Sequence, residues 1–221
     1  VDKFSRPVPR YTSYPTAPHF HAGINQDVYE DWLTALSPTA TASLYLHLPF
    51  CDRLCWFCGC HTKQTNRYGP VATYLAALGA EIDRIGALLG PRRVTALHWG
   101  GGSPSLIAPE DIGAITQRLR TAFNITDDVE FSVELDPNDM DEPRFDAWGQ
   151  AGLTRASIGV QDFDPRVQQA INRIQTPGQT RAVVEAVRRR GVRSVNIDML
   201  YGLPHQTVAG AVATARQVME M

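Results

Sequence analysis

The sequence predicts an α/β protein in which parallel strands form a partial (β/α) barrel, preceded by an extended N-terminal arm. Two observations support the barrel. Helical patterns separate most of the strand-like runs, and polar or glycine-rich segments follow the run ends. The five runs are residues 43–49, 94–99, 129–135, 155–161 and 194–201. The 221 residues are enough for one large domain or two small ones.

The N-terminal segment predicts the arm. Residues 6–18 contain four prolines, which exclude both a helix and a central strand. Residues 26–36 follow as a short amphipathic helix. We therefore expect an arm and short helix in residues 1–36 and the barrel domain in residues 37–221. Because the chain stops inside a helix-like run, we expect this barrel to be truncated at its C-terminal end.

The segments between the strand-like runs predict helices. Residues 74–89 place apolar side chains at steps of three and four, and residues 109–123, 143–150 and 179–190 are further candidates. Gly191 suits the position that follows the last of these helices. Strands that alternate with helices indicate right-handed βαβ units and a parallel sheet. Alternation alone leaves open whether this sheet is flat or curled.

Residues at the ends of the strand-like runs favour the curled sheet, because reactive groups of (β/α) barrels gather at the C-terminal strand ends. In chain order, these residues are the cysteine-rich stretch 51–60, the glycine-rich stretch 100–105, Glu134 with Asp136, Gln161 with Asp162, and Asp198 with the stretch 201–204. Asp198 lies in an apolar run, so we expect a buried carboxylate that needs a partner.

Composition narrows the class of protein. The net charge of −2 gives no general attraction to nucleic acid. No apolar run has the length of a membrane span, and no signal-peptide pattern opens the chain, so we expect a cytoplasmic protein. All four cysteines fall within one ten-residue stretch, which cannot tie distant segments together as disulfides do. This clustering indicates a metal or redox site.

The spacing of the cysteines favours an iron–sulfur cluster. Cys51, Cys55 and Cys58 lie at offsets of four and three, so a compact loop can wrap one face of a cubane cluster. Structural zinc usually takes two separated ligand pairs, and the sequence offers no second pair. Zinc binding and free structural thiols remain alternatives, and by spacing alone Cys60 is a possible fourth ligand.

The spacing Cys-x3-Cys-x2-Cys after a first strand resembles the radical S-adenosylmethionine (SAM) superfamily, and the surrounding sequence is most similar to its oxygen-independent coproporphyrinogen III oxidases. The matching stretches are residues 10–16, 45–51, 58–60, 98–102, 159–163 and 196–204. Ser103-Pro-Ser105 stands where that family usually has Thr-Pro-Thr, which keeps a hydroxyl group. The family also has a further C-terminal half, which includes the sixth barrel strand.

The resemblance implies specific roles for residues. Three cysteines would ligate a [4Fe-4S] cluster, with Cys60 as an extra cysteine that does not bind it. The implied cluster ligands are Cys51, Cys55 and Cys58, and the implied SAM contacts are Tyr45, Phe57, Gly101, Gly102, Ser103, Glu134, Gln161, Arg173 and Asp198. Carboxylates suit the hydroxyl and amine groups of SAM, and a guanidinium suits its carboxylate. By the same resemblance, two SAM molecules bind.

The function implied by the resemblance is radical SAM oxidoreductase activity in heme (porphyrin) biosynthesis. Two propionate side chains of coproporphyrinogen III would be decarboxylated oxidatively to vinyl groups, giving protoporphyrinogen IX. The partners would be the porphyrinogen substrate, an unidentified electron donor and an unidentified electron acceptor, with no nucleic acid and no membrane span. Alternatives are a heme chaperone or a heme-degrading methyltransferase of the same superfamily, or a non-catalytic zinc-binding module.

Overall fold

The computed structural model describes residues 15–221, so most of the predicted arm lies outside the described residues. The chain divides into two compact units, Val1–Pro38 and Thr39–Met221. In the first unit, a 3-10 helix (η1, Ala17–His19) precedes helix α1 (Gln26–Thr34). Helix α1 begins where the Asn25 side chain accepts a hydrogen bond from the Val28 N–H group, as expected of an N-cap residue.

The second unit is built on one five-stranded parallel sheet. Its strands are β1 (Ala42–Leu48), β4 (Arg93–Gly101), β5 (Asn124–Leu135), β6 (Arg155–Gln161) and β7 (Ser194–Met199). Their order in the sheet, β1-β4-β5-β6-β7, is their order along the chain. A sheet that always adds its next strand on the same side winds as a barrel does, whereas a doubly wound sheet reverses direction. The prediction of a partial (β/α) barrel is confirmed.

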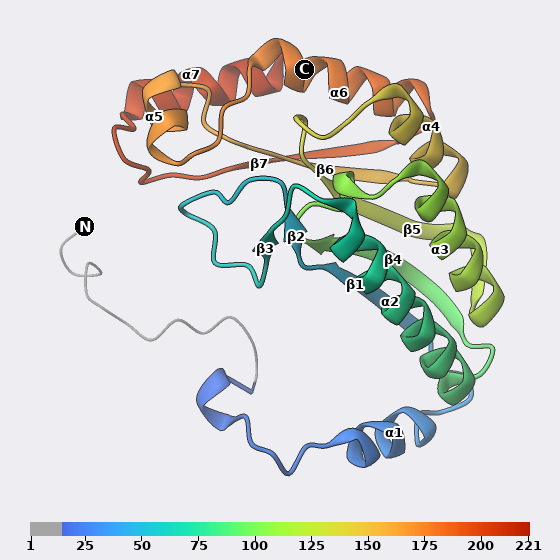
Figure 1. Ribbon diagram of the computed structural model, residues 1–221. Coiled ribbons are helices and arrows are strands. Elements are labelled where there is room, and N and C mark those ends of the chain that lie inside the picture. The colour runs from blue at the N-terminus through green and yellow to red at the C-terminus, as the bar shows by residue number, and fades with distance from the viewer. Residues whose placement is uncertain (1–14) are drawn as a thin grey trace. The chain divides into compact units, whose positions relative to one another are not determined.

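Helices connect successive strands, and one more follows the last strand. The connecting helices are α2 (Tyr68–Leu89), η2 (Pro104–Leu106), α3 (Pro109–Ala122), α4 (Glu142–Ala151), α5 (Pro165–Ala170) and α6 (Pro177–Arg189), and α7 (Val208–Met219) follows β7. Figure 1 shows α2, α3, α4 and α6 along the outer side of the curved sheet. The inner side is therefore left for the side chains that point toward the barrel axis. No helix of residues 15–221 is long and apolar enough to cross a membrane.

The core lies between the sheet and its helices. Trp99 of β4 and Trp148 of α4 are fully buried, and their rings meet edge to face with centroids 5.2 Å apart. Phe131 of β5 completes this aromatic cluster. Because alternate strand residues point to opposite faces, His98 next to Trp99 faces the inner side of the sheet. Packing on the outer face thus fixes which residues face the barrel interior.

Most of the predicted elements are found, with ends that differ by a few residues. Helix α2 begins six residues earlier than predicted, and β5 begins five residues earlier. Gly191 follows the C-cap residue of α6 with a φ of +89°, as the sequence predicted. Helix α5 and the two-stranded sheet of β2 (Phe50–Cys51) and β3 (Lys63–Gln64) were not predicted from the sequence. Strands of two residues carry no periodicity, so a pattern search cannot detect them.

Candidate functional site

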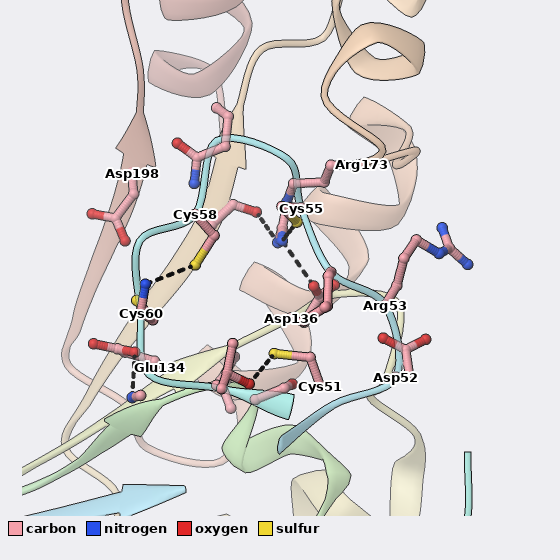
Figure 2. Close-up of a pocket in the computed structure, with 18 of the residues that line it drawn as sticks. Cys51, Asp52, Arg53, Cys55, Cys58, Cys60, Glu134, Asp136, Arg173 and Asp198 are labelled. Carbon is pink, nitrogen blue, oxygen red and sulfur yellow. Dashed lines mark hydrogen bonds and ion pairs between the residues drawn. The ribbon is translucent and has the colours of Figure 1, made fainter. Parts of the chain in front are cut away.

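A cavity of about 250 Å³ lies at the C-terminal ends of the barrel strands, between these ends and the cysteine-rich loop. Figure 2 shows the loop arched over this space. Of the residues that the sequence predicts for the site, all except Tyr45 line it. They are Cys51, Cys55, Phe57, Cys58, Gly101, Gly102, Ser103, Glu134, Gln161, Arg173 and Asp198. The fold therefore gathers residues that are up to 147 positions apart in the sequence into one pocket.

Tyr45 lies beside this cavity on the inner face of β1. Its ring is stacked on that of His98, with centroids 5.5 Å apart and planes within 12° of parallel. Its hydroxyl group is 3.0 Å from Nδ1 of His47. The Tyr45 side chain is 56% exposed, so it can contact a ligand that extends beyond the pocket along the barrel interior.

The cysteine-rich loop is anchored at its start and near its middle. Cys51 closes strand β2, which pairs with β3, and its sulfur lies 3.2 Å from the Thr62 hydroxyl oxygen. Near the middle of the loop, the Trp56 N–H group donates to the Ile171 carbonyl at 3.0 Å, and the Asn172 side chain donates to the Leu54 carbonyl at 2.8 Å. These contacts hold the loop against the segment that follows α5.

The four cysteines are free thiols. Burial raises the pKa of Cys51 and of Cys55, and burial together with the neighbouring Cys58 raises the pKa of Cys60 to about 11. Across residues 15–221, no three His, Cys, Asp or Glu side chains are close enough to hold a single metal ion. A cubane cluster binds each thiolate at a different iron atom, so it needs a wider spacing of the sulfur atoms than a single metal ion does.

The glycine-rich segment after β4 joins the strand ends to the cysteine-rich loop. Gly102 donates to the Leu48 carbonyl at 2.6 Å, and the next residue, Ser103, donates to the Phe50 carbonyl at 2.7 Å. A Cβ atom on Gly102 would lie 2.3 Å from that Phe50 oxygen. Gly101 has a φ of +108°, which a side chain would disfavour. The two glycines therefore serve a close backbone approach as well as lining the cavity.

Glu134 ends β5 with its carboxylate at the cavity. One oxygen accepts a hydrogen bond from the Gly101 N–H group at 3.1 Å, and the other lies 3.3 Å from Nε2 of His98. These two contacts orient the carboxylate while leaving the side chain 43% exposed. The arrangement suits a group that accepts hydrogen bonds from the hydroxyl or amine groups of a ligand.

Arg173 crosses the floor of the cavity and is 11% exposed. It forms an ion pair with Asp136 at 2.9 Å and donates to the Gly159 carbonyl at 2.8 Å, and one guanidinium nitrogen lies 3.6 Å from the Cys55 sulfur. Its Nε atom is buried without a hydrogen-bond partner in the described part of the chain. Asp136 was named at a strand end but was not predicted as a site residue, because a carboxylate before proline is equally typical of a turn.

Asp198 corrects an expectation from the sequence. Its side chain is exposed rather than buried, because β7 is the edge strand of the sheet. The carboxylate accepts hydrogen bonds from the Asn196 side chain at 2.7 Å and from the Ser157 hydroxyl at 3.1 Å. Neither partner was predicted. Ser157 lies on β6, and the sequence cannot reveal which residues of β6 and β7 stand in register, whereas Asn196 is two residues away on the same strand and could have been found from this spacing.

A second carboxylate that the sequence did not indicate is Asp139, in the loop after β5. It accepts a hydrogen bond from the Ser103 hydroxyl at 2.8 Å. Burial raises the pKa of Asp139 to about 6, against the lowering effect of this hydrogen bond. Asp139 thus lies behind the cavity wall, in contact with one residue that lines it.

Together, the fold and the cavity define a class of protein: a parallel barrel that holds a thiolate-bound centre beside an organic ligand at its strand ends. The family model of the radical SAM superfamily matches residues 45–218. The chain belongs to the radical SAM superfamily. Membership implies a [4Fe-4S] cluster and SAM, and a pocket lined by free thiols together with carboxylate, amide and guanidinium side chains fits both groups.

Comparison with individual proteins narrows the resemblance. The oxygen-independent coproporphyrinogen III oxidase of Paracoccus denitrificans is 50% identical over 204 residues, which are 92% of this chain and 45% of that protein. The solved structure of coproporphyrinogen III oxidase from Escherichia coli, a radical SAM enzyme, matches with a TM-score of 0.89 and 38% identity, over 95% of this chain and 48% of that one. The chain spans about half the length of the curated relatives it matches.

A more distant structure shares the fold alone. The radical SAM methyltransferase TsrM from Kitasatospora setae matches with a TM-score of 0.54 and 17% identity, over 82% of this chain and 35% of that one. Five parallel strands with their helices are thus common to proteins with different chemistry, so the fold by itself does not select a substrate.

Proposed function

We propose that this chain is the radical SAM portion of an oxygen-independent coproporphyrinogen III oxidase of heme biosynthesis. The enzyme decarboxylates two propionate side chains of coproporphyrinogen III oxidatively to vinyl groups, giving protoporphyrinogen IX. The observation that carries the proposal is the single cavity that gathers the three cysteines with the polar strand ends. The names of the relatives, at up to 50% identity, supply the substrate.

The proposal assigns the cluster to Cys51, Cys55 and Cys58, with Cys60 beside it as a non-ligand. When bound, the reduced cluster supplies an electron to SAM, and SAM supplies the radical that removes a β-hydrogen from the propionate. The carboxylate group of that propionate would then be lost as CO₂ and one further electron would pass to an acceptor, so that the two remaining carbon atoms form the vinyl group. The chain itself provides the thiolates, the orientation of both groups and a partly enclosed pocket.

The ligand contacts follow from the chemistry of the lining residues. Gly101, Gly102 and Ser103 would border the methionine portion of SAM, where a close backbone approach is needed. Carboxylate and amide groups would bind the ribose and the amine, and the guanidinium of Arg173 would bind the carboxylate. The other proposed contacts are Tyr45, Phe57, Glu134, Gln161 and Asp198.

The remaining parts of the proposal concern the number of SAM molecules, the domain boundaries, the cellular location and the electron-transfer partners. We propose two SAM molecules per chain, an arm and short helix in residues 1–36, a barrel domain in residues 37–221, and a cytoplasmic location. An electron donor and an electron acceptor, both unidentified, complete the partners. The exposed Tyr45 next to the cavity supports a ligand region larger than one SAM molecule needs.

The first test is the metal content of the chain. After anaerobic reconstitution with iron and sulfide, we expect about four iron atoms per chain. Adding SAM should change the EPR signal of the reduced protein, because SAM binds at the same cavity. Stoichiometric zinc without a visible charge-transfer band would overturn the proposal.

The second test is the ligand side of the cavity. Asp198→Asn should weaken SAM binding about ten- to a hundredfold at unchanged iron content, as for loss of one hydrogen bond to a charged group.

The third test is turnover. In the complete polypeptide that the gene encodes, anaerobic incubation with reductant, SAM and coproporphyrinogen III should release two CO₂ per porphyrinogen. Binding of SAM without CO₂ release would favour another heme-related activity of the superfamily.

A further inference from the structure

A buried polar network lies directly behind the ligand side of the cavity, with Asp162 at its centre. The Asp162 side chain is 0% exposed. Its carboxylate accepts hydrogen bonds from the Thr214 hydroxyl at 3.0 Å, from the Asp164 N–H group at 2.8 Å and from the Gln206 side chain at 2.6 Å. Three donors thus satisfy the buried carboxyl group, an arrangement that fixes their positions closely.

Gln206 extends this network into the loop between β7 and α7. Its amide nitrogen also donates to the Leu200 carbonyl at 2.9 Å, and its amide oxygen accepts from the Gly202 N–H group at 2.8 Å. One side chain therefore closes the turn that follows Asp198 and links that turn to Asp162. The Leu200 N–H group donates in addition to the Gln161 carbonyl at 3.3 Å.

Gln168 extends the network in the opposite direction, to the segment that carries Arg173. Its side-chain nitrogen donates to the Asp162 carbonyl at 2.9 Å and to the Gln175 carbonyl at 2.6 Å, and its side-chain oxygen accepts from the Gln175 N–H group at 3.2 Å. Its own carbonyl accepts from the Arg173 N–H group at 3.0 Å. Gln168 is 5% exposed and Gln175 is 2% exposed, so these bonds are shielded from water.

The backbone next to Asp162 is strained. Gln161 has a φ of +68°, a left-handed conformation that residues other than glycine, asparagine and aspartate seldom adopt. Such strain persists only where the surroundings hold it, and it is concentrated at functional sites. The Gln161 side chain lines the cavity, so the strained conformation directs it toward the ligand.

We propose that Asp162, Gln168 and Gln206 are positioning residues for SAM binding. They tie together the three segments that carry Gln161, Arg173 and Asp198, and each of these segments contributes one proposed ligand contact. This inference rests on the proposed function, because it takes SAM as the ligand of the cavity. It adds that the ligand side of the cavity is built in advance by side chains that do not line the cavity, two of them buried.

A double-mutant cycle on SAM affinity tests the inference, in the chain reconstituted anaerobically with iron and sulfide. We expect Gln206→Ala to weaken SAM binding about fivefold, because the turn after Asp198 loses its cross-link. In the Asp198→Asn background, the same change should weaken binding less than about twofold. The matched control is Gln169→Ala, an exposed glutamine on α5, which should change affinity in neither background.

Hydrogen exchange provides a readout that does not need SAM. The amides of Gly202 and Leu203 should exchange faster in Gln206→Ala than in the wild type, while those of α2 are unchanged. If Gln206→Ala does not retain iron, Gln206→Met replaces it, since it keeps the side-chain length and removes only the hydrogen bonds.

The outcomes separate the two proposals. Equal losses of affinity in both backgrounds, or a lower melting temperature with unchanged affinity, would show that Gln206 only stabilises the fold and would overturn this inference alone. If the wild-type chain holds iron but binds no SAM, the proposed function itself is wrong.

Discussion

The cysteine-rich loop and the strand ends face each other across one cavity, but side chains hold them to different degrees. In residues 51–60, contacts reach Cys51 and the middle of the loop, whereas the Cys58 and Cys60 side chains are exposed. At the ends of β5, β6 and β7, the polar side chains that line the cavity are bonded to neighbours. Arg173 is paired with Asp136, and Glu134 and Asp198 each accept two hydrogen bonds or close polar contacts.

This difference indicates that the strand ends serve SAM binding and the cysteine-rich loop serves cluster binding. The strand ends that would contact SAM are already linked by hydrogen bonds and an ion pair, so they lose little conformational freedom when SAM binds. More of the free energy of their contacts with SAM therefore appears as affinity. Under the proposed function, metal–sulfur bonds would add to the order of the thiol loop, as is common where metal binding and local folding are coupled. Changes in the loop should therefore act on the cluster, and changes behind the strand ends should act on stability and on SAM.

The largest expected effect is the loss of the cluster from the loop. Cys51→Ser, Cys55→Ser and Cys58→Ser should each lose most of the iron, because a hydroxyl group is a poor replacement for a thiolate ligand. Cys60→Ser should keep both the iron content and the SAM-induced change in the EPR signal. The measurement is iron and sulfide analysis after anaerobic reconstitution of each variant.

Cys60→Ser is also the variant that can contradict this picture. Cys60 lies in the same loop and lines the same cavity as the three proposed ligands, so its substitution is a matched control. If it loses iron as completely as the other three, four thiolates close the site. No iron atom would then remain for SAM, and the proposed mechanism would be wrong.

The cysteine-rich loop and the strand ends form two walls of the cavity, and the sequence predicts the residues of the first wall more fully than those of the second. Cysteine spacing is local information, so ten consecutive residues indicate four candidate thiols, and the resemblance to the radical SAM superfamily then implies which three bind the cluster. The side chains that line the strand ends follow from the rule that barrel sites lie there. Their partners do not, because Ser157 meets Asp198 only through the register of β6 and β7, which depends on packing of the whole sheet.

The same reasoning explains why the exposure of Asp198 and the hydrogen-bond network around Asp162 were not predicted. Asp198 was expected to be buried because its run is apolar, but burial depends on whether another strand covers that edge. Asp162 was recognised at a strand end, yet its role as the centre of a buried network needs Gln206 and Thr214, which lie 44 and 52 residues further along the chain. Hydrogen bonds over such separations leave no periodic signal in a single sequence.

A change at the contact between the two walls should have an intermediate effect. Gly102→Ala would place a Cβ atom 2.3 Å from the Phe50 carbonyl oxygen and 2.8 Å from that of Leu48, both of them backbone atoms that cannot turn away. We expect the free energy of unfolding to fall by about 1–3 kcal/mol, as for other overpacked sites. Urea unfolding under anaerobic conditions measures this change.

Gly113→Ala is the matched control for that measurement. Gly113 lies in α3, is exposed, and has no atom within 4 Å of its expected Cβ position. Alanine is the better helix former, so the free energy of unfolding should rise by about 0.5–1 kcal/mol. If Gly102→Ala is tolerated as well as Gly113→Ala, the two walls are not held as closely as the structure shows.

The smallest expected effect concerns Asp139 and pH. Burial raises the pKa of Asp139 to about 6 in the folded chain, above the value of about 3.9 for an unfolded aspartate. Between these values the folded state binds more protons than the unfolded state, so the free energy of unfolding falls as the pH rises from 4 to 6. Because Asp139 is partly exposed, we expect this contribution to be about 1 kcal/mol after allowance for solvent screening.

Asp139→Asn isolates this contribution, since asparagine does not titrate. Relative to the wild type, the variant should gain about 1 kcal/mol of unfolding free energy between pH 4 and pH 7, measured by urea unfolding at a series of pH values. Ser103→Ala removes the hydrogen bond that lowers the pKa of Asp139, so it should shift the loss of stability to higher pH. If the difference between Asp139→Asn and the wild type is the same at every pH, the carboxyl group does not titrate in this range. The contact between Ser103 and Asp139 would then not depend on whether the Asp139 carboxyl group is protonated.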